Sequence, residues 1–175
     1  LRNIADTDDL TELNNRRAFL EVAQQTMDTL RSSGRAFAIL MIDIDDFKRI
    51  NDTYGHGVGD TVIRGIALML RSALRPSDVA GRFGGEEFVA LIADVSENEA
   101  VAAAERIRDR AAQMRLMTSA GHIGVTVSIG VAFGGSRALR IDDMIEEADG
   151  ALYIAKRSGR NRVALAAPVE ARLRA

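Results

Sequence analysis

Three aspartates at the end of an apolar run are the first residues whose type and spacing suggest chemistry. Residues 36–44 read AFAILMIDI, and the chain continues as Asp45-Asp46-Phe47-Lys48. A continuous apolar run of this length predicts a central strand covered on both faces. Carboxylates that close such a strand are costly unless they are paired or bound to a cation. We therefore expect Asp43 to bind a metal ion, whereas Asp45 and Asp46 suit capping of a short helical turn.

A glycine pair followed by two glutamates, Gly84-Gly85-Glu86-Glu87, is the second candidate. Two glycines between short apolar runs predict a hairpin, because tight primed turns need positive φ. By itself such a pair is a mere turn, but the adjacent glutamates favour a site. Consecutive strand residues point to opposite faces, so one glutamate can join Asp43 while the other faces away.

The segment at 51–60, NDTYGHGVGD, carries a third polar group. Its Gly, Asn and Asp content predicts an irregular loop that presents Asn51, His56 and Asp60. A carboxylate can accept hydrogen bonds from the N1–H and amino group of guanine, and an amide can meet its other edge. Spacing alone favours the alternative, in which these residues cap the loop and Asp60 is the N-cap of the next helix.

Composition limits the chemistry that these residues can support. The chain has 175 residues, no cysteine, two distant histidines and a formal net charge of −2. This excludes disulfides and zinc–thiolate sites, and leaves a hard cation such as magnesium on oxygen ligands. It gives no basic field for nucleic acid, and no apolar run approaches the roughly 20 residues of a membrane-spanning helix.

The elements that must position these residues alternate between helix and strand. The patterns predict helices at 16–31, capped by Asn15, and at 61–75, 97–114 and 141–157, and strands at 36–44, 79–83, 87–92, 125–133 and 162–166. This order predicts an α/β (α+β) fold, a mixed central sheet flanked by helices with a ferredoxin-like β-α-β-β-α-β core. That fold alone does not indicate a function.

Taken together, the segments resemble the GGDEF family from about Asp8 to Val163. The matching motifs, in chain order, are DDLTELNNRR at 8–17, DIDDFK at 43–48, ND at 51–52, GH at 55–56, GD at 59–60, RFGGEEF at 82–88, SIG at 128–130, ADGALYIAK at 148–156 and GRN at 159–161. Glu12 replaces the usual glycine, and Glu86 stands for the aspartate in the family's name, which is a common active form. The resemblance implies a palm-type domain similar to nucleotidyl cyclases and polymerases.

The resemblance further implies a diguanylate cyclase, which condenses two GTP molecules into cyclic di-GMP and releases pyrophosphate. Asp43, the Ile44 carbonyl and Glu86 would hold Mg²⁺ on the triphosphate, two ions per GTP site, with Mn²⁺ as an alternative. Glu86 would also be the general base for the 3′-hydroxyl, with Glu87 beside the metal. The residues implied to bind GTP are Phe47, Lys48, Asn51, His56, Asp60, Gly84, Gly85, Lys156 and Arg160. Among these, Asn51 and Asp60 would read guanine, and Lys48, Lys156 and Arg160 would neutralise phosphates.

An R-x-x-D pattern, Arg75-Pro76-Ser77-Asp78, occupies the place of the family's product-inhibition site. Arginine can fork onto the phosphates of cyclic di-GMP or stack on its guanine, and Asp78 can accept from a guanine edge. Arg106 is a candidate for a secondary contact. The alternative is a charged pair at a helix end, where arginine suits the helix dipole.

Two GTP molecules must react with each other, so the resemblance also implies a homodimer in which two copies face across a two-fold axis. We divide the chain into a lead-in at 1–14, the GGDEF domain at 15–167 and a tail at 168–175. A start at Leu1 without an initiator methionine leads us to expect an upstream sensor domain. We expect the domain to lie in the cytoplasm. This location is also compatible with a full-length protein that is attached to a membrane.

Three other functions compete with this interpretation. A silent GGDEF domain would bind GTP or cyclic di-GMP only to regulate a partner, but silent copies usually lose Asp43, Glu86 or Asp60. A related cyclase making a cyclic mononucleotide is disfavoured by the signature hairpin and the R-x-x-D pattern. A purely structural or interaction module would leave the acids unexplained.

Overall fold

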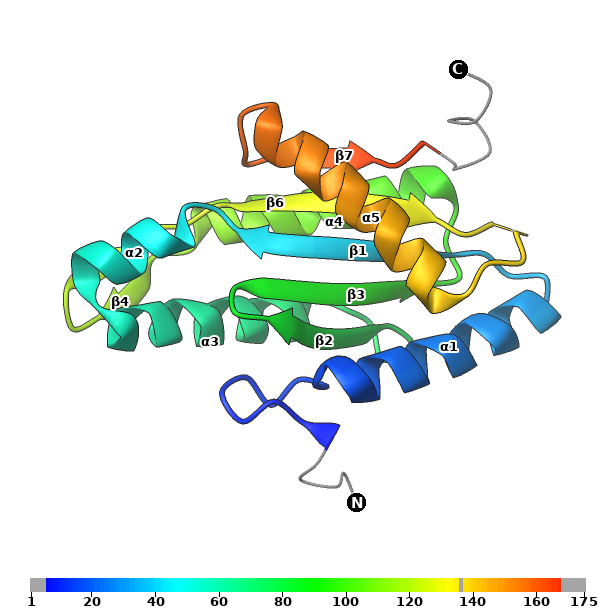
Figure 1. Ribbon diagram of the computed structural model, residues 1–175, viewed down its shortest axis with the longest axis horizontal. Helices are drawn as coiled ribbons and strands as arrows, with labels where there is room; N and C mark the ends of the chain where they lie inside the picture. The colour runs from blue at the N-terminus through cyan, green and yellow to red at the C-terminus, as the bar shows by residue number, and fades with distance from the viewer. Residues whose placement is uncertain (1–5, 136, 168–175) are drawn as a thin grey trace.

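The computed structural model describes residues 6–135 and 137–167, which build a five-stranded sheet with helices on both faces (Figure 1). The elements, in chain order, are α1 (Arg16–Ser32), β1 (Phe37–Ile44), α2 (Phe47–Tyr54), α3 (His56–Ala73), β2 (Val79–Gly84), β3 (Glu87–Ala93), α4 (Glu97–Gln113), β4 (Leu116–Thr118), β5 (Gly121–Ile123), β6 (Val127–Phe133), α5 (Ile141–Arg157) and β7 (Val163–Leu165). The strand order is β2-β3-β1-β6-β7, antiparallel except between β6 and β7. The predicted mixed sheet with its ferredoxin-like core is confirmed.

Strand β1 lies at the centre of the sheet, and all of its residues are buried. Its side chains alternate between two hydrophobic clusters. Ala38, Leu40 and Ile42 pack with residues of α3 and α4, whereas Phe37, Ile39 and Met41 pack with α1 and α5. Both faces of β1 are therefore dry, so a charged group at its end is removed from bulk water.

Helix α5 packs against β6 so closely that Gly130 has no room for a side chain. A Cβ at Gly130 would lie 2.0 Å from the carbonyl oxygen of Ala148 and 2.3 Å from the amide nitrogen of Leu152. Both are main-chain atoms of α5, so the clash cannot be relieved by rotating a side chain. This contact fixes how α5, and every side chain on it, lies over the sheet.

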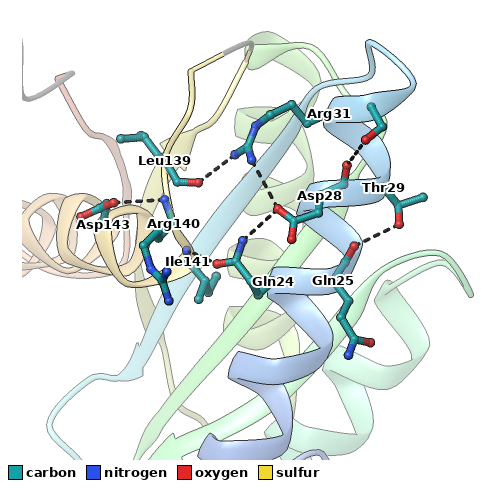
Figure 2. Close-up of polar contacts among 10 residues, drawn as sticks. Gln24, Gln25, Asp28, Thr29, Arg31, Leu139, Arg140, Ile141 and Asp143 are labelled. Atoms are coloured by element: carbon teal, nitrogen blue, oxygen red, sulfur yellow. Dashed lines mark hydrogen bonds and ion pairs between the residues drawn. The ribbon is translucent and has the colours of Figure 1, made fainter.

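Helix α1 holds the start of α5. Its N-cap is Asn15, as the sequence predicts, and the Asn15 side chain accepts from the amide of Ala18. Further along α1, Gln24 Oε1 accepts from the amide of Ile141 at 2.9 Å, and Arg31 Nη2 donates to the carbonyl of Leu139 at 2.7 Å (Figure 2). The first helix is thereby bonded to the segment that leads into the last one.

The predicted loop at 51–60 is wrong, because these residues are helical apart from a single break. Gly55, with φ of +88°, separates α2 from α3. Gly59 lies inside α3, where a Cβ would come within 1.9 Å of Asn51 Oδ1, so its glycine reflects close helix packing. Asp60 is likewise inside α3 and is not the N-cap of a helix. The small β4–β5 hairpin was not predicted from the sequence either.

The ends of the chain are described only in part. Residues 1–5 of the expected lead-in and the expected tail at 168–175 lie outside the described residues. Within the remaining lead-in, Thr7 bridges to Asn14, and Asn14 bridges to Gly81 of β2. No helix among the described residues has the length and apolar character needed to cross a bilayer.

Replacing Gly130 by alanine should destabilise the fold by about 2–3 kcal/mol, because the new methyl group forces α5 away from β6. Gly57→Ala is the matched control, since a Cβ at Gly57 has nothing within 4 Å. Urea unfolding followed by circular dichroism measures both. Equal unfolding midpoints for Gly130→Ala and the wild type would show that the contact is not tight.

Candidate active site

The predicted catalytic segments meet at one end of the sheet, on the left in Figure 1. The carboxyl end of β1, the tip of the β2–β3 hairpin and the last turn of α5 lie together there, with α2 following directly after β1. Antiparallel pairing places Asp43 opposite Glu87 of β3 and Ser128 of β6. Residues more than 100 positions apart in sequence thus share one site.

Asp43 is the most strongly perturbed acid of this site. It is 4% exposed, and its Oδ2 accepts a hydrogen bond from Lys156 Nζ at 2.7 Å. Burial raises the pKa of Asp43 to about 6, opposed by the Lys156 ammonium and assisted by the charges of Glu86 and Glu87. A carboxylate that ionises this reluctantly is poised to gain from a bound cation.

Glu86 and Glu87 are brought to Asp43 by the hairpin. The amide of Ile44 donates to the carbonyl of Glu86 at 3.2 Å, which fixes the hairpin tip against the end of β1. Both glutamates are half-buried, and both carry enough charge near Asp43 to influence its pKa. The charge of both glutamates therefore adds to the cost of ionising Asp43.

The two glycines of the hairpin serve a different purpose from the predicted one. Neither Gly84 nor Gly85 has positive φ, so the expectation of a primed turn is wrong. The register instead shifts between Arg82 and Gly84. Nothing lies within 4 Å of a Cβ placed on Gly85, and at Gly84 the nearest atom is Glu87 Oε2 at 3.6 Å. These glycines leave the hairpin tip open, as approach of a ligand to its backbone requires.

Arg82 links the tip of the hairpin to the N-terminal segment. Its Nε and Nη2 donate to the carbonyl of Gly85 at 3.2 and 2.8 Å, and its Nη1 lies 3.1 and 3.2 Å from the two carboxylate oxygens of Asp8. Asp8 also accepts from the amide and hydroxyl of Thr11. Burial opposes ionisation of Asp8, but the bonds from Thr11 and Arg82 leave its pKa lowered. The N-terminal segment thereby holds the signature turn in place.

Asp45 is a buried junction, which corrects its expected role as a helix cap. Its carboxylate accepts from Thr126 Oγ1 at 2.6 Å, Ser128 Oγ at 2.7 Å and the amide of Asn161 at 3.0 Å. Asp46 does occupy the N-cap position of α2, but its side chain makes no capping bond. It lies 3.6 Å from Arg160 Nε instead. The two aspartates together hold the turn that carries Arg160.

The expected nucleoside residues lie on the facing helices α2 and α3. His56 and Asp60 are exposed, whereas Asn51 is half-buried, and its Oδ1 is buried without a hydrogen-bond partner. Phe47 is 8% exposed and belongs to the core beneath these helices. Lys48 is exposed and pairs with Asp52 at 3.0 Å, one turn along α2.

Arg75 and Asp78 lie at the other end of β3. The Asp78 side chain is 3% exposed and accepts from the amides of Arg75 at 2.8 Å and Ala93 at 3.0 Å. Arg75 Nη2 bonds to Asp78 and to the carbonyl of Ala93, yet half of the Arg75 side chain stays exposed. A cavity of about 270 Å³ beside them is also lined by Arg106 and Arg110 of α4.

The acids at the end of β1 do not form a complete metal cage. Among the described residues, no group of three or more His, Asp or Glu side chains is arranged to hold a metal ion by itself. The donor set still fits a hard divalent cation, because it consists of carboxylates around one buried, reluctantly ionised aspartate. A cation there would need further oxygen ligands from a bound molecule or water.

Comparison with known proteins decides the family. The model of the family described as "Diguanylate cyclase, GGDEF domain" matches residues 5–162. The chain belongs to this family. Diguanylate cyclase A of Treponema denticola is 41% identical over 94% of this chain and 45% of its own length. The chain thus spans less than half of that relative, and 36% of diguanylate cyclase DosC of Escherichia coli, to which it is 40% identical.

Solved GGDEF domains have the same fold. The GGDEF domain of DgcB from Caulobacter crescentus, in complex with c-di-GMP, superposes with a TM-score of 0.88 at 34% identity, covering 96% of this chain and 97% of that one. The active GGEEF domain of a diguanylate cyclase from Vibrio cholerae gives a TM-score of 0.81 at 31% identity, covering 88% and 97%. The latter is named for the same signature that this GGDEF domain carries.

The structure adds positioning residues to those singled out from the sequence. Asp8, Arg82 and Ser128 fall within the matched motifs, but only the fold shows that they hold the hairpin and Asp45. Thr126 has no sequence signal of its own. Glu12, at the motif position where the family pattern has glycine, adopts a φ of +58°, in the left-handed region that favours glycine.

Asp43→Asn should stabilise the metal-free domain at neutral pH, by up to about 3 kcal/mol. The pKa of Asp43, about 6 in the folded state, lies above its ordinary 3.8. Its contribution to stability is therefore fully present below pH 3.8 and lost as the pH rises through 6. The gain from asparagine should be near zero at pH 4 and largest above pH 6.

Urea unfolding of both proteins between pH 4 and 8 in EDTA measures this difference. Asp9→Asn, which removes a carboxylate at an exposed position, is the matched control. A constant difference across the pH range would contradict the raised pKa.

Proposed function

We propose that this GGDEF domain is a diguanylate cyclase that condenses two GTP molecules into cyclic di-GMP. Each 3′-oxygen forms a bond to the α-phosphorus of the other GTP, each α–β phosphoanhydride bond breaks, and two pyrophosphates leave. The observation that carries the proposal is the convergence of Asp43, Glu86, Glu87 and Lys156 at the end of β1. Phosphoryl transfer needs such positioned acids and cations more than covalent chemistry.

Divalent cations, Mg²⁺ or Mn²⁺ and two per site, would be held by Asp43, the Ile44 carbonyl and Glu86, with Glu87 alongside. When bound, they neutralise the charge that develops on the phosphates. Glu86 accepts the proton of the 3′-hydroxyl. Lys48, Lys156 and Arg160 are cationic groups near this end of the sheet, and we assign to them the binding of the triphosphate.

Guanine recognition is assigned to Asn51 and Asp60, with His56 lining the nucleoside site. The buried Asn51 Oδ1 without a partner supports this, because such groups call for a ligand or water. Gly84 and Gly85 leave space for the substrate at the hairpin tip. Phe47 supports Asn51 from the core beneath rather than through a polar contact.

One site per domain implies that two domains act together. Two copies facing across a two-fold axis would aim each 3′-hydroxyl at the other α-phosphate. A rate that rises only linearly with protein concentration in dilute solution would contradict this arrangement. The chain spans less than half the length of the two cyclases compared above, so we assign control of pairing to an upstream sensor domain. We place the enzyme in the cytoplasm, where GTP is made.

Glu86→Gln should abolish cyclic di-GMP synthesis, with a loss of about 10²–10⁴-fold in rate, because the amide cannot accept the proton. The assay incubates concentrated protein with GTP and Mg²⁺ and separates the nucleotides by chromatography. Glu97→Gln, at an exposed position of α4, is the control and should retain synthesis. If the wild type forms no product even when a fused dimeriser forces pairing, the domain is a nucleotide-binding regulator instead.

Product inhibition is proposed at Arg75, Asp78 and Arg106. Asp78 is already engaged by main-chain amides, so the arginines are the groups free to gain charged contacts with the product. Arg106→Ala and Arg75→Lys should each raise the half-inhibitory concentration of cyclic di-GMP about tenfold, since a charged hydrogen bond contributes about 1.5–3 kcal/mol. Arg64→Ala, exposed on α3, is the control. Inhibition unchanged in both variants would place the product elsewhere.

A further inference from the structure

Among the described residues, Lys156 is the one cationic side chain in direct contact with Asp43. Its Nζ lies 2.7 Å from Asp43 Oδ2, where the side chain of Asp43 is only 5% exposed. Glu86 and Glu87 add negative charge nearby. The ammonium is thus bonded to one carboxylate and has the negative charge of two more nearby, and the same negative charge attracts a divalent ion.

We propose that Lys156 is the resident counter-cation of the metal-free site, and that a divalent metal ion must displace it from Asp43. This inference rests on the proposed function, because it assigns the metal to Asp43. Lys156 then has two positions. It neutralises Asp43 before the metal binds, and it is released towards the nucleotide phosphates afterwards.

The contact and the metal exclude each other for electrostatic reasons. Lys156 Nζ holds Oδ2 of Asp43, and an ammonium kept beside a divalent ion on the same carboxylate would repel that ion in a poorly hydrated site. Retaining a buried Asp43 without either cation is also unfavourable. The site should therefore hold one cation or the other at Asp43.

The length, flexibility and partial exposure of the Lys156 side chain suit such an exchange. Lys156 lies in the last turn of α5, its side chain is 36% exposed, and its flexible four-carbon stem can carry the charge away from Asp43. The helix itself is fixed against β6 by the contact at Gly130. The movement consequently needs only side-chain rotation, and the backbone can remain in place.

The exchange is tested by measuring Mn²⁺ affinity of the purified chain by calorimetry without nucleotide. Lys156→Met keeps the stem and removes the charge, so it should bind Mn²⁺ about tenfold more tightly than the wild type. Lys156→Arg keeps the charge and should not gain affinity. Arg157→Met removes the neighbouring exposed charge, which contacts Tyr153, and should bind Mn²⁺ like the wild type.

A double-mutant cycle gives a second readout. Without metal, Lys156→Met should lower the unfolding midpoint in the wild-type background but not in Asp43→Asn. In saturating Mn²⁺ that cost should vanish, because the metal has taken over the role of the lysine. Mn²⁺ affinity of Lys156→Met equal to or below that of the wild type would overturn the proposal, as would undiminished binding to Asp43→Asn.

These results separate the inference from the function on which it rests. Cyclic di-GMP synthesis by the wild type, with no gain in Mn²⁺ affinity in Lys156→Met, removes only the exchange. A gain in affinity without any synthesis, even when a fused dimeriser forces pairing, supports the exchange and removes the assignment as a cyclase.

Discussion

The desolvated carboxylate of Asp43 is the constraint on which the rest of this structure depends. The central strand β1 is covered on both faces, so an acid at its end is separated from bulk water. Two glutamates on the adjoining hairpin increase the cost of its charge, and a single lysine reduces it. The negative charge of the site is therefore only partly neutralised, and the proposed nucleotide with its metal ions would neutralise the rest.

The surrounding fold keeps these charges close together. Arg82 and Asp8 hold the hairpin tip, Asp45 joins the end of β1 to β6 and to the turn before β7, and the contact at Gly130 seats α5 so that Lys156 reaches Asp43. Each brace links segments distant in sequence. The arrangement resists relaxation, because moving the carboxylate of Asp8, Asp43 or Asp45 would break contacts that are themselves buried or bidentate.

The two ends of β3 adjoin different proposed sites. Glu87 begins the strand beside Asp43, and Ala93 ends it with its amide and carbonyl bonded to Asp78 and Arg75. The proposed catalytic and product-binding sites are therefore separated by the length of one strand. A product molecule at the far end would not obstruct GTP directly, so its effect would have to pass through the sheet or through the pairing of two domains.

Much of this domain was predictable from sequence, because its signals are local. The apolar run at 36–44 determined a central strand, Asn15 and Ser96 marked helix starts, and the motifs around Asp43 and Glu86 identified the family. The predictions from sequence were wrong at glycines, because a glycine can have any of several structural roles. Gly55 breaks a helix and Gly59 allows two helices to touch, so a loop was predicted where two helices lie. Gly85 leaves space open without positive φ, so the primed turn predicted at the hairpin is absent. Only the tertiary structure placed Lys156 on Asp43 and made Asp45 a junction, since burial and charge pairing across more than 100 residues depend on which surfaces the fold brings together.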